Sequence, residues 1–134
     1  MDIEYNGMMP VVDIEAIEQA VEAYIDEHMG GTGYYVVHTE DSRVEAVREY
    51  IEESLWAFNA SFISYHTNVS EEAIEKVQEL YEGANEVLIE LIEDMDNLVD
   101  DAVMSDGYGH FLSSYDGEEH EVEVNGDTYF IYAN

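Results

Sequence analysis

The sequence has no cysteine and only three basic side chains among its 134 residues. The absence of cysteine excludes disulfide bonds and thiolate metal sites. The N-terminal stretch MDIEYNGMMPVV has neither a basic region nor a long apolar run, which argues against a signal peptide. No segment approaches the length of about 20 apolar residues that a membrane-spanning helix needs. We therefore expect a soluble, cytoplasmic protein with no membrane partner.

Negative charge is the most unusual property of the chain. Asp and Glu together number 33, against Arg43, Arg48 and Lys76, so the formal net charge is -30. Solubility of a small domain needs a net charge of only about 2 to 8, and self-repulsion beyond that destabilises the compact state. The charge repels nucleic acid and anionic membranes, which excludes both as direct ligands. It favours cationic partners: metal ions, basic proteins, or the positive groove of a nucleic-acid-binding protein.

The remaining composition is that of a folded protein. Hydrophobic residues make up 46% of the chain and include eleven tyrosines and four phenylalanines, which is enough to form a core. The length suits one domain. We therefore predict a single acidic α+β domain over residues 1–134.

Two helices and a strand are predicted in the first half. Asp13 is predicted to cap an amphipathic helix that ends at Gly30-Gly31, and the short segment GYYVVH, residues 33–38, is typical of a strand. A second helix is expected to begin with Asp41 or Ser42 as its cap. Its expected inward-facing residues are Val44, Val47, Ile51, Leu55 and Phe58.

A long third helix is predicted from the segment Asn68–Glu71, which has the character of a capping box, to about Met104. Its apolar residues alternate spacings of three and four, as in a heptad seam. These are Ile74, Val77, Tyr81, Ala84, Leu88, Leu91, Met95, Leu98 and Ala102. The seam predicts an antiparallel bundle of about three helices, or alternatively a homodimer formed through a coiled coil.

The last part of the sequence predicts a β-hairpin. The alternating segments EHEVEV and TYFIY flank Asn125-Gly126, a strong signal for a two-residue turn. Such a turn pairs Val122 with Tyr129 and His120 with Ile131. We expect this hairpin to belong to a small antiparallel sheet.

No catalytic motif is present, so we expect neither an enzyme nor a cofactor. There is no calcium-binding loop, no H-E-x-x-H, no G-x-S-x-G and no phosphate-binding glycine loop. The five histidines are scattered along the chain, and we predict no metal site. The best candidate for a cation is the group Asp116, Glu118, Glu119 and His120, and whether it binds one stays open.

A row of carboxylates is predicted on the long helix. At a rise of about 1.5 Å per residue, spacings of three and four repeat them about every 5 to 6 Å along one face, which is comparable to the spacing of backbone phosphates. The predicted contact row consists of Glu75, Glu79, Glu82, Glu86, Glu90, Glu93 and Asp94.

In size, acidity and helical carboxylate rows, the chain resembles the DNA-mimic inhibitors of bacteriophages and mobile elements. The segments LWAFNASF, DGYGHFLSSYDGEE and YFIYAN are also similar to small tailed-phage proteins with no assigned activity. The first resemblance implies an inhibitor, of the anti-CRISPR or antirestriction kind, that occupies the basic groove of a host nucleic-acid-binding defence protein.

Three alternatives stay open. The chain could be an acidic partner or chaperone of one basic protein without DNA mimicry, a cation-binding domain, or a halophilic protein. Halophilic chains usually favour Asp over Glu and avoid Ile, whereas this chain has 22 Glu, 11 Asp and ten Ile, which argues against the last.

Overall fold

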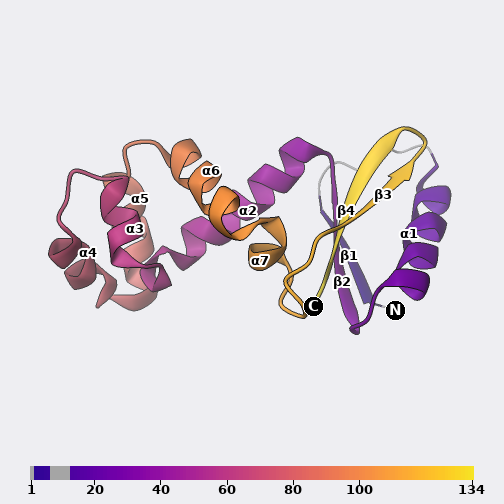
Figure 1. The fold of residues 1–134 in the computed structure, drawn as a ribbon, viewed down its shortest axis with the longest axis horizontal. Coiled ribbons are helices and arrows are strands. Elements are labelled where there is room, and N and C mark those ends of the chain that lie inside the picture. Colours follow the sequence, from indigo (N-terminus) through magenta and orange to yellow (C-terminus); the bar gives the residue numbers. More distant parts are fainter. Residues whose placement is uncertain (1, 7–12) are drawn as a thin grey trace. The chain divides into compact units, whose positions relative to one another are not determined.

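The computed structural model describes residues 2–6 and 13–134, which form two compact units (Figure 1). The first unit comprises residues 1–47 and 106–134, and the second comprises residues 48–105. The chain passes from one unit to the other within a helix, between Val47 and Arg48, and returns at the end of another helix.

The first unit contains the strands and three helical segments. Its elements are β1 (Asp2–Asn6), α1 (Ile14–His28), β2 (Gly33–His38), the first half of α2 (Glu40–Ser54), α7 (Tyr108–Leu112), β3 (His120–Val124) and β4 (Asp127–Ala133). The second unit is helical. Its elements are the rest of α2, the 3-10 helix η1 (Leu55–Ala57), α3 (Ala60–Tyr65), α4 (Glu71–Gln78), the 3-10 helix η2 (Tyr81–Gly83), α5 (Ala84–Leu91) and α6 (Met95–Asp106).

The four strands form one mixed sheet in the order β1-β2-β4-β3. β1 runs parallel to β2, whereas the pairs β2–β4 and β3–β4 are antiparallel. The α+β class is therefore right, but the predicted purely antiparallel sheet is wrong. Sequence reasoning missed β1, because its five residues DIEYN are mostly polar and their strand conformation depends on pairing with β2.

The C-terminal hairpin was predicted to the residue. Val122 pairs with Tyr129 and His120 with Ile131. Asn125 and Gly126 have φ angles of 54° and 86°, the positive values that a type I′ turn requires at both central positions. This turn fixes the register, and the register places Tyr129 and Ile131 on one face of the sheet.

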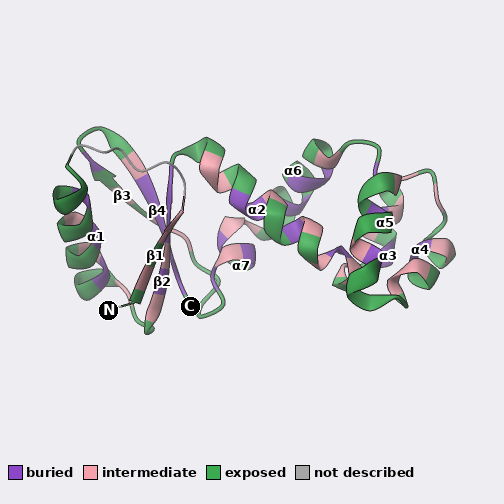
Figure 2. Ribbon diagram, turned by 180° about the vertical axis from the view of Figure 1, so that it is seen from behind, coloured by how far each residue is buried: buried purple, intermediate pink, exposed green. Residues whose placement is uncertain are grey.

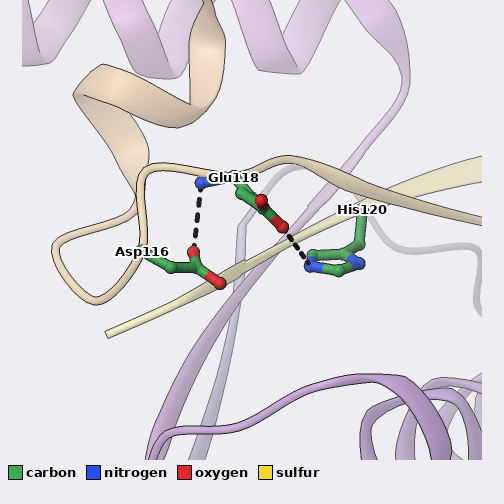
Figure 3. A group of neighbouring side chains, drawn as sticks. All are labelled: Asp116, Glu118 and His120. Carbon is green, nitrogen blue, oxygen red and sulfur yellow. Dashed lines mark hydrogen bonds and ion pairs between the residues drawn. The ribbon is translucent and has the colours of Figure 1, made fainter.

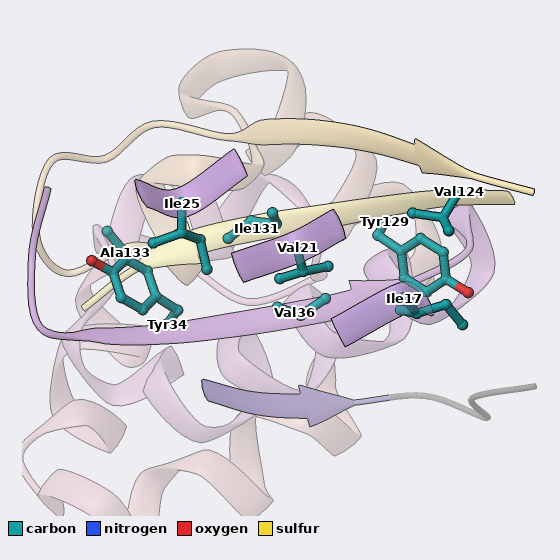
Figure 4. Close-up of a cluster of buried hydrophobic side chains, with 9 residues drawn as sticks. All are labelled: Ile17, Val21, Ile25, Tyr34, Val36, Val124, Tyr129, Ile131 and Ala133. Carbon is teal, nitrogen blue, oxygen red and sulfur yellow. The ribbon is translucent and has the colours of Figure 1, made fainter. Parts of the chain in front are cut away.

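That face of the sheet is covered by α1 (Figure 4). Ile17, Val21 and Ile25 recur at intervals of four residues on the helix and are at most 2% exposed. They pack with six residues of the sheet, namely Tyr34, Val36, Val124, Tyr129, Ile131 and Ala133. The helix was predicted at this place, although Asp13 contributes its backbone carbonyl rather than a side-chain cap.

The opposite face of the sheet carries a second cluster. Val37, Phe130 and Tyr132 are buried there with Ala46 of α2, and Tyr108 and Leu112 of α7 pack against them. α2 begins at Glu40, one to two residues before the predicted caps. The Thr39 hydroxyl, rather than Asp41 or Ser42, accepts a hydrogen bond at its start, from the backbone N–H of Ser42 at 3.2 Å.

The predicted long third helix is wrong. Residues 71–106 form α4, η2, α5 and α6 in place of one continuous helix. Tyr81 has a φ of 55°, which a right-handed helix cannot accommodate, and Ile92 is extended with a ψ of 123°. Asp94 then accepts a hydrogen bond from the backbone N–H of Asn97 and caps α6. The apolar residues do recur at heptad spacing in the sequence, but they do not lie on one helix, because the helix is interrupted at Tyr81 and at Ile92.

The second unit therefore has a core of short helices in place of a three-helix bundle. Its fully buried residues come from every segment except η2: Ile51, Leu55, Ile63, Ile74, Ala84, Leu88 and Leu98 each have 0% exposure. Ile74, Ala84, Leu88 and Leu98 belong to the predicted seam, whereas Tyr81 is 69% exposed. The seam is thus divided among separate packing contacts within the unit, while the homodimer stays a prediction.

Two side-chain amides link the segments of this unit. Asn85 accepts a hydrogen bond from the backbone N–H of Trp56 at 2.9 Å and donates one to the carbonyl of Glu53 at 2.7 Å. Gln78 donates to the carbonyls of Leu55 and Phe58. These bonds satisfy backbone groups where α2 ends and η1 begins, groups that a helix end leaves without partners. They hold α4 and α5 against that end.

No helix in the described part of the chain is both long and apolar enough to cross a membrane.

Candidate acidic interaction surface

Arg43 is used inside the first unit. Its guanidinium lies 2.9 Å from a carboxylate oxygen of Glu119. It also stacks on two aromatic rings, 4.0 Å from the centroid of Tyr108 and 4.1 Å from that of Phe130. The other oxygen of Glu119 accepts a hydrogen bond from Tyr132 at 2.5 Å. This cation is mostly buried and contributes little to the field at the surface.

The other two basic residues belong to the second unit. Arg48 contacts two carboxylates, Glu52 at 3.1 Å and Asp96 at 2.6 Å. Lys76 is exposed on α4 and has no ion pair among the described residues. Residues 48–105 contain fifteen of the 33 acids. Acids therefore greatly outnumber Lys and Arg in this unit.

The seven residues of the predicted contact row are all exposed, as is half of α5, where exposed residues are green in Figure 2. The structure spreads them over five segments, however. Glu75 lies in α4, Glu79 directly follows it, Glu82 is in η2, Glu86 and Glu90 are in α5, and Glu93 and Asp94 connect α5 to α6. Because the helix is broken, they do not form one straight row with a regular repeat.

Two members of the row, Glu82 and Glu86, lie across a groove from glutamates of α2. Together they line this groove, which has a volume of about 540 Å³, on the second unit. The residues of this glutamate groove are Glu49, Glu52, Glu53, Glu82, Asn85, Glu86 and Ile89. The hydrogen bonds of Asn85 to Glu53 and Trp56 hold its two walls together.

The predicted contact row did not include Glu49, Glu52 and Glu53 of the second helix beside Glu82 and Glu86. Asn85, a polar residue between Glu82 and Glu86 on the heptad-patterned segment, is the signal that could have indicated a contact with the second helix. Its amide needs partners, and the carbonyl and N–H groups at the end of α2 supply them. The other five members of the row lie outside the groove lining.

The candidate cation group divides in two. One ligand atom each from Asp116, Glu118 and His120 lies within 4.8 Å of the others (Figure 3). Asp116 accepts a hydrogen bond from the Glu118 N–H at 3.0 Å, the Glu118 carboxylate lies 3.9 Å from Nε2 of His120, and Nδ1 of His120 faces the Tyr24 hydroxyl. Glu119 faces Arg43 and leaves the group. Two carboxylates and an imidazole are suitable ligands for a divalent cation, but the two acids are solvent-exposed.

Three tyrosines of the first unit, Tyr5, Tyr129 and Tyr132, have raised pKa values. Burial raises the pKa of Tyr5 to about 12, with Glu18 and Glu22 of α1 adding to the effect. Burial, followed by the hydrogen bond to Glu119, raises the pKa of Tyr132. The raised pKa values keep both of these phenols neutral at neutral pH, and the Tyr132 hydroxyl donates its hydrogen bond to the Glu119 carboxylate.

No protein-family model matches the sequence, and no curated protein and no solved structure is significantly similar to it.

Proposed function

We propose that this protein is an inhibitor of a host nucleic-acid-binding defence protein, such as a CRISPR effector or a restriction enzyme, and that it occupies the basic groove in which that protein binds nucleic acid. In this proposal the chain acts in the host cytoplasm as an anti-CRISPR or antirestriction protein of phage type. It binds no nucleic acid itself and needs no cofactor.

The observation that carries the proposal is the arrangement of charge on the second unit. Five glutamates line one groove, and of the two cations in residues 48–105 Arg48 is already bound to two carboxylates. A structural use for charge would pair it internally, as Arg43 is paired with Glu119. The excess is instead exposed, at a cost in self-repulsion. A basic partner that releases that repulsion on binding accounts for it.

The groove also changes which carboxylates imitate phosphate. A DNA-binding groove gains affinity by placing Lys and Arg against phosphates and releasing counterions. Two walls of carboxylates, from α2 and from η2 and α5, would present such a groove with two anionic rows. We therefore place Glu53, Glu82 and Glu86 at the centre of the contact, with Glu75, Glu79, Glu90, Glu93 and Asp94 around it.

The test is displacement of labelled duplex DNA from purified defence proteins, measured by fluorescence anisotropy. We would assay a guide-loaded Cas effector and a restriction enzyme, the two classes that the proposal names. The wild-type chain is expected to displace the duplex from one of them. The triple variant Glu53→Lys, Glu82→Lys and Glu86→Lys is expected to lose at least about 100-fold in potency, about 1 kcal/mol for each charge.

A matched control separates the groove from net charge. Glu15, Glu18 and Glu22 are exposed on α1 in the first unit, and replacing all three by Lys changes the net charge by the same amount. This control variant should keep most of its potency. Equal loss in both triple variants would mean that only overall charge matters, and failure of the wild-type chain to displace duplex from either class would contradict the proposal.

One observation favours a second candidate, an acidic partner that covers a basic protein without imitating DNA. The break of the long helix removes the regular repeat of carboxylates that a copy of the phosphate backbone would need. In that case the chain would bind its partner while the partner still bound nucleic acid.

A further inference from the structure

A second groove on the second unit combines aromatic and acidic side chains. It has a volume of about 460 Å³ and lies between the end of α3 and the last turns of α6. This tyrosine groove is lined by Phe62, Tyr65, His66, Asp101, Met104 and Ser105. None of its members belongs to the glutamate groove or to the predicted contact row.

The apolar walls of the tyrosine groove are left uncovered. Met104 is 85% exposed and Tyr65 is 82% exposed, the two largest values among the exposed large hydrophobic side chains in the described part of the chain. Both project from segments whose inner faces are well packed, since Ile63 and Ala102 are at most 3% exposed. Their exposure is therefore not the result of poor packing of α3 and α6.

The acidic side chain of the groove is held in place from beneath. His66 lies between two rings, with centroids 5.3 Å from that of Phe62 and 5.2 Å from that of Tyr65. Its Nε2 is 2.9 Å from a carboxylate oxygen of Asp101. The His66 side chain is only 9% exposed, whereas that of Asp101 is 50% exposed. The imidazole thus orients a carboxylate that still faces solvent.

The electrostatics of the tyrosine groove favour a cation. The last turn of α6, which ends at Asp106, contributes the partial negative charge of a helix C-terminus. Asp100 and Asp101 are exposed on the same helix, and no Lys or Arg lines the groove. This field would repel an anionic occupant, and a purely apolar occupant would take the Asp101 carboxylate out of water without giving it a new partner.

We propose that the tyrosine groove binds an arginine side chain of the basic partner. The proposal rests on the proposed function, because it assigns a second contact to the same basic protein. A planar guanidinium can stack on the Tyr65 ring while it hydrogen-bonds to the Asp101 carboxylate. The apolar stem of the arginine would lie along Met104. A lysine ammonium cannot stack in this way and is more strongly hydrated, so arginine is preferred.

The probe is a pair of capped tripeptides, Gly-Arg-Gly and Gly-Lys-Gly, titrated into the isotopically labelled full chain and followed by NMR. The arginine peptide is expected to shift the amide signals of residues 62–66 and 101–105 most strongly. It is also expected to bind about three-fold or more tightly than the lysine peptide at this groove. Shifts of equal size over all acidic helices, or equal affinity of the two peptides, would overturn the proposal.

Two matched pairs of variants test the named side chains. Asp101→Asn is expected to weaken arginine-peptide binding about five-fold, while Asp100→Asn, which removes the same charge from the next residue, is expected to change it little. Tyr65→Ala is expected to weaken it, while Tyr81→Ala, at another exposed tyrosine of the same unit, is not. Equal effects within either pair would contradict the assignment of those side chains.

The arginine site and the inhibition can be disproved independently of each other. If the arginine peptide does not select the tyrosine groove but duplex DNA is still displaced through the glutamate groove, only this inference is wrong. If the peptide binds as described and no duplex is displaced, the arginine site stands and the proposed function is wrong.

Discussion

At the scale of single residues, Gly109 shows how little space the first unit leaves around the loop that carries Asp116 and Glu118. A Cβ added at Gly109 would lie 2.3 Å from the carbonyl oxygen of Gly117 and 2.7 Å from the carbonyl carbon of Glu118. Both neighbours are backbone atoms and cannot rotate away. The packing of α7 against this loop therefore requires glycine.

We predict that Gly109→Ala destabilises the protein by about 1 to 3 kcal/mol, the usual cost of overpacking. The control is Gly83→Ala, because the added Cβ there lies 3.9 Å from its nearest neighbour and the residue has an ordinary helical φ of -63°. The control is expected to be neutral or stabilising by about 0.4 to 1 kcal/mol. Urea unfolding of both variants measures the difference, and equal midpoints would show that α7 is not packed on the loop as described.

At the scale of elements, local signals predicted what local chemistry determines. Asn125-Gly126 fixed the hairpin and its register, because two positive φ values permit few alternatives. The apolar period of residues 14–28 predicted α1, and the β-forming residues 33–38 predicted β2. In each case the residues of the segment itself favour the conformation that the structure shows.

The prediction of a long third helix was wrong because contacts with residues distant in the sequence help to determine the structure of this segment. The heptad spacing is uninterrupted in the sequence, yet the helical backbone is interrupted at Tyr81 and again at Ile92. Like charges three and four residues apart weaken a long helix, and Asn85 gains two hydrogen bonds to the end of α2 only in the broken arrangement. The glutamate groove exists because of these breaks, so its α2 wall could not be derived from a continuous helix.

We predict that Asn85→Ala loosens the second unit at the end of α2 and costs about 1 to 3 kcal/mol, because it leaves the Trp56 N–H and the Glu53 carbonyl without their partner. Trp56 is the only tryptophan in the chain and lies against Tyr81, so its fluorescence reports this change directly. Asn97→Ala, an exposed site on α6, is the control. An unchanged emission spectrum and midpoint in Asn85→Ala would contradict the bridging role of this amide.

At the scale of the whole molecule, the net charge of -30 controls how stability depends on salt. Screening shortens the reach of repulsion from about 30 Å at 0.01 M to about 10 Å at 0.1 M ionic strength. Because Arg43, Arg48 and Lys76 are the only Lys and Arg side chains, few attractions can be weakened by screening. Repulsion is therefore the larger effect of the two.

We predict that the melting temperature rises steadily as NaCl is added from about 0.01 M to about 0.5 M at neutral pH. A variant with Glu15, Glu18 and Glu22 replaced by Gln should gain less from the same addition, since it has less repulsion to screen. A melting temperature that is flat over this range would mean that bound cations already compensate the charge. Unfolding at low salt with full stability only at molar salt would favour the halophilic alternative.

The central claim is that the glutamate groove and nucleic acid compete for one basic site on the target. The most direct measurement is mass photometry of a defence protein that this chain inhibits, mixed with saturating duplex DNA and saturating inhibitor. The account predicts two populations, target with DNA and target with inhibitor, and none carrying both. A ternary complex of target, DNA and inhibitor would contradict it.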